Sequence, residues 1–142
     1  MDLRLDIDDK PTQADVQVLR DGLNTHALRH TGEPGFSPVA VWLRDGDDKV
    51  VAGAYGMLSW NFLEVNLLWV DESLRGTGLG RKVLGAIEDE GRRRGCSHVQ
   101  LDTFEFQALG FYRSLGYEVF GTLERYVKDF DRYYLRKPLG PA

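Results

Sequence analysis

The sequence has few of the residues that mark several specialised classes of protein. Its 142 residues include a single cysteine, Cys96, which excludes an internal disulfide framework and fits a reducing compartment. The formal net charge is -4, so bulk charge gives no support for a nucleic-acid-binding protein. No apolar run approaches the length of a membrane span, and the N-terminal residues lack the apolar core of a signal peptide. We therefore expect a cytoplasmic protein with neither nucleic acid nor membrane as a partner.

Metal-binding and nucleophilic residues are also scarce. His26 and His30 have helical spacing, but no glutamate stands beside the first and no third ligand accompanies them, so they indicate a helix face. Cys96 has no evident histidine partner, which argues against a cysteine nucleophile. We expect no metal in this protein.

What is present is the patterning of an ordinary globular protein, and the length favours a single domain over residues 1–142. Leu3, Leu5 and Ile7 alternate with polar residues and predict a strand. A helix then follows Pro11-Thr12, and a loop of helix breakers covers residues 31–38. Beyond it we expect strands at 39–43, 49–60, 62–70, 98–103, 117–123 and 131–137, with helices at 78–94 and 106–115. This order predicts a mixed sheet flanked by helices.

Three alternating glycines, Gly76, Gly78 and Gly80, come directly after the apolar strand 62–70 and open the helix 78–94. At a helix start the backbone N–H groups lack intrahelical partners, and glycines leave them uncovered, so such a turn binds phosphate. The spacing is not that of a P-loop, since no Gly-Lys-Ser/Thr follows. It is not a dinucleotide fingerprint either, because Arg81 stands where a third glycine is required.

Two motifs resemble those of the GNAT superfamily of N-acetyltransferases. Val70 to Gly80 contains Arg75-x-x-Gly78-x-Gly80, which is similar to that family's acetyl-CoA motif. Ala108 to Tyr117 is similar to its second signature, a helix with a tyrosine followed by Leu-Gly-aromatic. The resemblance implies a GNAT fold of the α/β (α+β) class, with a mixed, mostly antiparallel central sheet flanked by helices.

The resemblance also implies the reaction, which is direct transfer of an acetyl group from acetyl-CoA to a primary amine. The CoA pyrophosphate would be held by the backbone of Arg75, Gly76, Thr77, Gly78, Leu79, Gly80 and Arg81. Leu68 and Val70 would pair through their backbones with the acetyl and pantetheine end. Glu105 stands where many relatives have an asparagine that contacts CoA.

Two residues are candidates for the proton transfers. Many GNAT members use a tyrosine at the position of Tyr112 to protonate the leaving thiolate; the alternative is that Tyr112 only packs in its helix. Glu64 lies six residues before Val70, so alternation predicts that both face the same side unless a bulge intervenes. Glu64 is then either the base that accepts the amine proton or a solvated strand charge.

The acceptor is not named by the sequence. We expect it against residues 31–37, 60–62 and 125–130, and a small-molecule amine is favoured over a protein amine by the compactness of the chain alone. A transferase for a longer acyl-CoA and a non-catalytic CoA-binding sensor are the alternatives, and a homodimer is left open.

Overall fold

The computed structural model describes residues 1–141, and its contacts divide the chain into two units, residues 1–35 and the chain from Phe36 on. The first unit contains helix α1 (Gln13–Thr31). Thr12 caps this helix by accepting a hydrogen bond from the Asp15 N–H, and Gly32 ends it in the left-handed conformation. The sequence predicted this helix. Within residues 1–141, no helix combines the length and apolar character needed to cross a membrane.

The strand expected at residues 3–7 is absent, and this prediction is wrong. Leu3, Leu5 and Ile7 belong to an irregular segment and are almost fully exposed. Alternation of apolar residues indicates which side of a strand would be buried, but a strand also requires a neighbouring edge with which to form hydrogen bonds. Residues 1–8 pair with no strand in the described structure.

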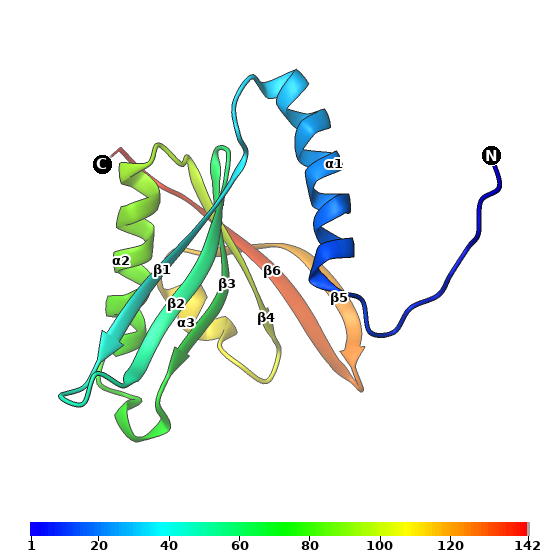
Figure 1. The fold of residues 1–142 in the computed structure, drawn as a ribbon. Helices are drawn as coiled ribbons and strands as arrows, with labels where there is room; N and C mark the ends of the chain where they lie inside the picture. Colours follow the sequence, from blue (N-terminus) through cyan, green and yellow to red (C-terminus); the bar gives the residue numbers. More distant parts are fainter. Residues whose placement is uncertain (142) are drawn as a thin grey trace. The chain divides into compact units, whose positions relative to one another are not determined.

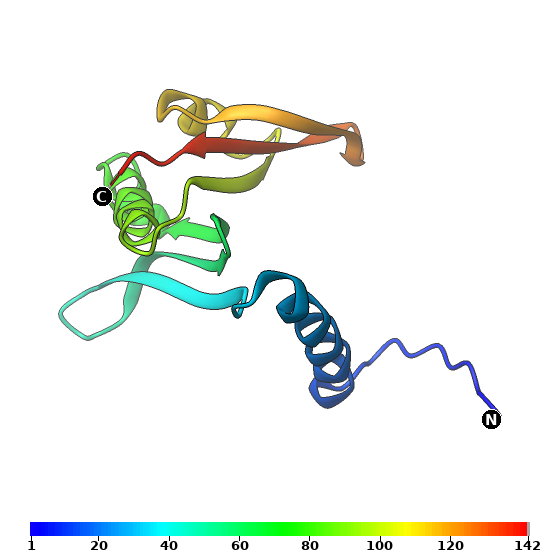
Figure 2. The same cartoon turned by 90° about the horizontal axis from the view of Figure 1, so that it is seen from above.

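The second unit is built on one six-stranded sheet with the strand order β1-β2-β3-β4-β6-β5 (Figure 1). The strands are β1 (Phe36–Arg44), β2 (Val50–Ser59), β3 (Phe62–Val70), β4 (His98–Phe104), β5 (Glu118–Val127) and β6 (Phe130–Pro138). Only β3 and β4 run parallel, and every other neighbouring pair is antiparallel. The mixed, mostly antiparallel sheet is therefore confirmed. The sheet is twisted, so that β1 and β6 run in crossing directions in Figure 1, and the view from above shows β1 and β5 at its two ends (Figure 2).

Helices α2 (Leu79–Arg93) and α3 (Leu109–Ser114) pack on one face of this sheet, and a short 3₁₀ helix, η1 (Glu72–Leu74), precedes α2. Helix α2 has one apolar side, and its Val83, Leu84 and Ile87 are fully buried. The sheet supplies the largest buried side chains that complete this core, which are Leu63, Val99 and Leu135. The core therefore joins α2 to the centre of the sheet.

A polar network crosses this core. Glu88 of α2 is 5% exposed, and its carboxylate accepts hydrogen bonds from the Tyr117 hydroxyl at 2.6 Å and from Lys137 Nζ at 3.0 and 3.1 Å. Each of these polar groups has a partner, as the burial of a charge requires. The network therefore ties α2 to Tyr117, which lies between α3 and β5, and to Lys137 of β6.

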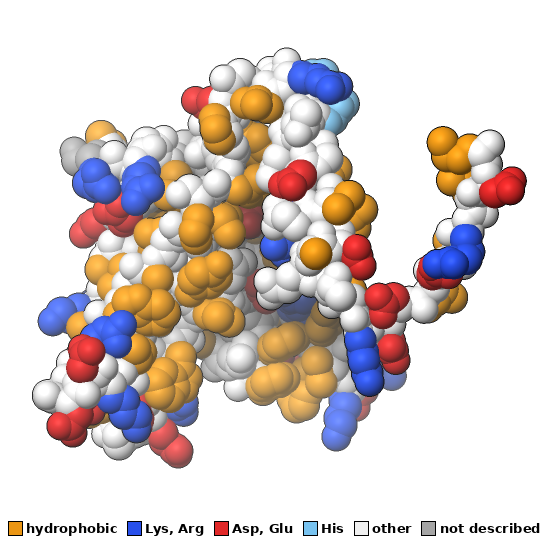
Figure 3. All heavy atoms as spheres, in the orientation of Figure 1, with side chains coloured by type: hydrophobic (Ala, Val, Ile, Leu, Met, Phe, Trp, Pro, Cys, Tyr) orange, Lys and Arg blue, Asp and Glu red, His pale blue; other side chains and the backbone are white. Residues whose placement is uncertain are grey.

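The opposite face of the sheet carries exposed apolar side chains. Trp42, Leu67 and Trp69 are each at least half exposed, and the strand register places Trp42 and Trp69 on the same face, on either side of Gly53. Apolar side chains gather over the strands on the face turned to the viewer in Figure 3. We refer to this side, opposite to α2, as the open face.

Candidate functional site

The centre of the sheet opens between β3 and β4. These parallel strands pair only through the three positions from Phe62↔His98 to Glu64↔Gln100. Beyond this point β3 continues along β2 as far as Val70, and β4 continues along β6 as far as Phe104. The edges that β3 and β4 turn toward each other therefore carry backbone N–H and C=O groups without a strand partner. An extended ligand with amide groups can satisfy them, since backbone polar groups require partners.

A β-bulge marks the place where the strands separate. Tyr55 pairs with Leu67 whereas its neighbour Gly56 pairs with Val65, so Asn66 is an extra residue in β3. A Cβ atom on Gly56 would overlap the carbonyl oxygen of Glu64, which explains why glycine stands opposite the bulge.

The bulge overturns the expectation that Glu64 and Val70 share a face. Val70 lies opposite Ala52, on the side of α2, together with Leu68. Glu64 lies opposite Met57 and therefore on the open face. The six-residue spacing predicted a common face, but one inserted residue reverses the alternation for everything that follows it.

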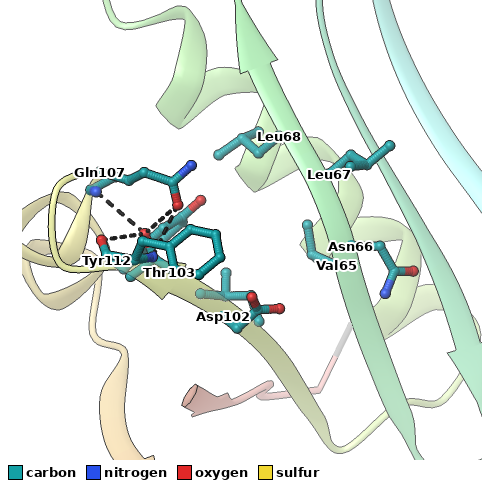
Figure 4. A pocket seen from close by; sticks show the side chains of 11 residues that line it. Val65, Asn66, Leu67, Leu68, Asp102, Thr103, Gln107 and Tyr112 are labelled. Atoms are coloured by element: carbon teal, nitrogen blue, oxygen red, sulfur yellow. Dashed lines mark hydrogen bonds between the residues drawn. The ribbon is translucent and has the colours of Figure 1, made fainter. Parts of the chain in front are cut away.

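A cavity of about 290 Å³ occupies the space between the separating strands (Figure 4). Its lining comes from β3, β4 and the start of α3, and comprises Val65, Asn66, Leu67, Leu68, Leu101, Asp102, Thr103, Phe104, Gln107, Ala108 and Tyr112. The structure thus brings together two residues predicted from the sequence, Leu68 and Tyr112. It leaves Glu64 and Val70 outside the lining.

Tyr112 lies on α3 and is 7% exposed, with its ring packed edge to face against Phe111 and Tyr117. Its hydroxyl has no hydrogen-bond partner among residues 1–141, although its ring lines the cavity. Burial, with a smaller contribution from the charge of Asp102, raises the pKa of Tyr112 from 10.0 to about 12. The phenol therefore holds its proton at neutral pH and can donate it.

The glycine turn lies between β3 and α2. Asp71 caps η1 through the N–H and hydroxyl of Ser73, and the Thr77 hydroxyl donates to the Leu74 carbonyl at 2.6 Å. Gly76 and Gly78 have φ values of 78° and 84°, which glycine adopts readily.

The first N–H groups of α2 open onto free space. Gly78 is the N-cap residue and supplies no capping side chain. A Cβ atom added to Gly76 or Gly78 would meet no other atom within 4 Å. An uncapped helix start beside free space fits the phosphate groups of CoA, because these N–H groups are unpaired and lie at the positive end of the helix dipole.

Two predicted ligand residues have other contacts. The Arg75 Nε donates to the Val70 carbonyl at 3.1 Å, so this side chain fastens the turn to β3. Glu105 is bonded on both sides to Asp131, whose N–H donates to its carboxylate at 3.0 Å and whose carbonyl accepts from its N–H at 2.9 Å. Glu105 therefore ties the loop before α3 to β6 and lies outside the cavity lining. Its contact with CoA stays a prediction.

Sequence reasoning missed the polar residues on the β4 side of the cavity, Asp102, Thr103 and Gln107. Gln107 Oε1 accepts from the Phe104 N–H at 3.0 Å, and the Thr103 hydroxyl oxygen accepts from the Ala108 N–H at 3.3 Å, so both shape the loop that leads into α3. Asp102 stands near the carboxyl end of the predicted strand 98–103. The available signal was therefore an acidic residue at a strand end, but nothing in the sequence showed that this end faces β3.

Comparison with known proteins shows the family to which a chain with this fold and cavity belongs. Residues 6–117 match the acetyltransferase (GNAT) family. The chain belongs to this family. The GNAT resemblance found in the two motifs is thereby confirmed, as are the GNAT fold and the acetyl-CoA-dependent N-acetyltransferase activity.

Relatives at moderate identity cover most of the chain. A blasticidin-S acetyltransferase from Streptomyces morookaense is 36% identical over 117 residues, which are 80% of this chain and 86% of that protein. An acetyltransferase from Agrobacterium fabrum is 34% identical over 107 residues, 75% of this chain and 78% of the relative. A crystal structure of an acetyltransferase from Agrobacterium tumefaciens superposes with a TM-score of 0.89 at 29% identity, covering 96% of this chain and 99% of the other.

One further structure holds the coenzyme itself. The crystal structure of an aminoglycoside 6'-N-acetyltransferase complexed with coenzyme A has a TM-score of 0.65, but at 19% identity it shows a shared fold alone. Binding of acetyl-CoA by the present chain follows from its family. Among residues 1–141, no group of three or more His, Cys, Asp or Glu side chains is arranged to hold a metal ion.

Proposed function

We propose that this N-acetyltransferase carries out direct transfer from acetyl-CoA to a small primary amine in the cavity between β3 and β4. The observation that carries the proposal is the separation of these strands directly beside Tyr112. When bound, acetyl-CoA supplies the acetyl group as a thioester. The coenzyme would be held by backbone groups of Leu68 and Val70 that have no strand partner and by the N–H groups from Arg75 to Arg81.

Tyr112 is the proposed general acid. As the amine nitrogen bonds to the acetyl carbon, the carbon–sulfur bond breaks and the sulfur gains an electron pair. A phenol that lines the same cavity and holds its proton at neutral pH can protonate that sulfur. The nitrogen loses one proton in exchange, so the overall charge balances.

Glu64 stays our hypothesis for the group that receives the proton from the amine. Its position on the open face, outside the cavity lining, supports a route in which a water molecule carries the proton rather than direct contact. A Glu64→Gln variant should then lose activity most strongly at low pH, where less of the amine is already neutral. A pH–rate profile equal to that of wild type would overturn this role.

A small-molecule acceptor is supported by the relative named for blasticidin S, which matches 80% of this chain. The relative named as an N-alpha-acetyltransferase, from Mycobacterium tuberculosis, matches only 54% of this chain at 34% identity. We also propose a cytoplasmic location, because the only cysteine is a free buried thiol and such thiols persist in reducing compartments.

The experiment is release of CoA thiol from acetyl-CoA and from longer acyl-CoA donors, measured against a panel of amines and confirmed by mass spectrometry of the acylated product. Transfer of acetyl with multiple turnovers supports the proposal. Faster turnover with a longer acyl group would favour the longer-chain transferase. Tight CoA binding without turnover on any amine would indicate the non-catalytic sensor.

A further inference from the structure

The cavity is lined by one acidic residue, Asp102, which has no role in the acetyl transfer described above. Asp102 of β4 is partly buried, and its side chain lies on the β4 side of the cavity, across from the β3 residues (Figure 4). It is the only carboxylate among the lining residues. Asp102 and Tyr112 line the same cavity, and the charge of Asp102 adds to the effect of burial in raising the pKa of Tyr112.

Asp102 is fixed by a single partner that leaves half of its carboxylate available. The Nε of Arg132 in β6 donates to Oδ2 at 2.9 Å, and its Nη2 lies 2.8 Å from the same oxygen in an ion pair. Both contacts are to Oδ2, and Oδ1 has no partner within residues 1–141. A carboxylate held in this way can still accept a hydrogen bond from a ligand.

Arg132 is in turn held by aromatic rings. Its guanidinium lies 4.9 Å from the centre of the Tyr126 ring, 5.0 Å from that of Tyr134 and 5.6 Å from that of Phe104. These cation–π contacts and the ion pair fix the guanidinium from several sides. Asp102 therefore has a defined orientation before any acceptor binds.

Four aromatic side chains continue from the cavity, and we call them the aromatic cluster: Phe104, Phe106, Tyr126 and Phe130. Phe104 lines the cavity and stacks on Phe106 at 5.3 Å, and Phe106 in turn meets Phe130 edge to face at 5.1 Å. Phe106 is 53% exposed, Tyr126 50% and Phe130 42%. Exposed aromatic surface next to a binding cavity is suited to contact a ligand.

We propose that Asp102, held by Arg132, binds the ammonium group of the acceptor, and that the aromatic cluster selects an acceptor whose amine is carried on a flat aromatic or heteroaromatic body. Asp102 supplies a charge-assisted hydrogen bond through Oδ1, and the rings supply a stacking surface a short distance beyond it. This inference rests on the proposed function, and it names the class of acceptor that the same cavity takes.

The test compares two amines of similar size with the wild-type enzyme, 2-phenylethylamine and 2-cyclohexylethylamine. Stacking should favour the flat ring by about 5-fold in kcat/KM. In Phe106→Leu, which keeps an apolar side chain but removes one exposed ring, that preference should fall toward equality. Binding of 2-phenylethylamine to the enzyme–CoA complex, measured by calorimetry, provides a readout that does not depend on turnover.

Asp102→Asn tests the charged contact. Loss of a charge-assisted hydrogen bond should raise the KM for 2-phenylethylamine by about 30-fold. The affinity for CoA should stay at the wild-type value. Asp89→Asn is the matched control, because Asp89 pairs with Arg92 at 2.7 Å on the exposed side of α2, outside the cavity lining. It should leave the kinetics unchanged.

The outcomes separate the two proposals. Equal rates with the two amines, or an unchanged KM in Asp102→Asn, would overturn the acceptor assignment while the enzyme remains an active acetyltransferase. Failure of wild type to acetylate any amine, with CoA still bound, would overturn the proposed function and this inference together.

Discussion

Tyr117 donates its phenolic hydrogen to Glu88 over 2.6 Å inside the core, and Lys137 completes the charge pair with the same carboxylate. The two partners make different contributions. Tyr117 supplies a hydrogen bond, whereas Lys137 compensates a carboxylate that is almost without access to water.

Truncating the two partners should therefore have unequal effects on the free energy of unfolding. Lys137→Met leaves the Glu88 charge buried and uncompensated, and we expect a loss of about 3 kcal/mol. Tyr117→Phe removes one hydrogen bond and should cost about 1 to 2 kcal/mol. Urea unfolding gives both values. Arg136→Met on the exposed side of the same strand is the control, expected to lie within about 0.5 kcal/mol of wild type; equal losses in all three variants would contradict the charge argument.

Tyr112→Phe tests the proposed general acid. The ring packing against Phe111 and Tyr117 is kept, so we expect kcat to fall by about 100-fold while the affinity for CoA changes little. Steady-state kinetics and CoA calorimetry give the two quantities. Tyr117→Phe also removes a phenol from this part of the core and should retain kcat. A Tyr112→Phe enzyme with wild-type kcat on a genuine acceptor would exclude the acid role.

The raised pKa of Tyr112 has a consequence for stability at high pH. Its folded-state pKa of about 12 lies above the ordinary value of 10.0, so the protonated phenol favours the folded state. This contribution is fully present below pH 10 and is lost as the pH rises from 10 through 12. Between these values wild type should therefore lose more stability than Tyr112→Phe, as measured by urea unfolding at fixed pH. Parallel losses in the two proteins would show that Tyr112 does not contribute.

Gly78→Asp tests the phosphate site at the start of α2. The carboxylate would occupy the free space beside the first N–H groups of the helix, and we expect the affinity for CoA to fall by about 100-fold or more. Gly95→Asp is a closely matched control, since Gly95 has the same φ of 84° and equally free surroundings but follows the other end of α2. Both variants carry the same backbone strain, so only the difference between their CoA affinities reports on the site; equal affinities would remove the site from this turn.

The thiol of Cys96 should be unreactive in the folded protein. Cys96 is 5% exposed, and burial raises the pKa of its thiol above the ordinary value, so little thiolate is available to react. We expect a disulfide reagent to modify it only as fast as the protein unfolds, which can be followed by absorbance with and without urea. Rapid modification of the native protein would show that this part of the core opens. An unreactive Cys96 also leaves CoA as the sole thiol detected in turnover assays.

Elements with strong local signals could be predicted from the sequence. The apolar run of β3 and the glycines after it established that strand and the turn into α2, and the tyrosine helix completed the family resemblance. Local signals failed where the outcome depends on a distant partner. Leu3, Leu5 and Ile7 alternate as a strand does but have no edge to pair with, and Asn66 adds a residue to β3 without any turn or charge that marks a bulge.

Asp102 was missed for a related reason. The predicted strand 98–103 agrees with β4 to within one residue and includes Asp102. The common cavity of Asp102 and Tyr112, however, depends on β4 lying parallel to β3 and separating from it after Gln100. Strand order and register are set by packing across the whole sheet, and no local pattern in β4 encodes them.

The separation of β3 from β4 means that the sheet contains two edges in its interior, a position where most sheets have none. The amide hydrogens along these edges, from Leu67 to Val70 and from Leu101 to Thr103, then belong to two classes: those bonded to β2 or β6, and those without a strand partner. Hydrogen exchange should distinguish the classes in the free protein, and CoA should slow exchange of the second class alone. We therefore expect the bound donor to act as a short seventh strand, which would complete the sheet only during the reaction cycle.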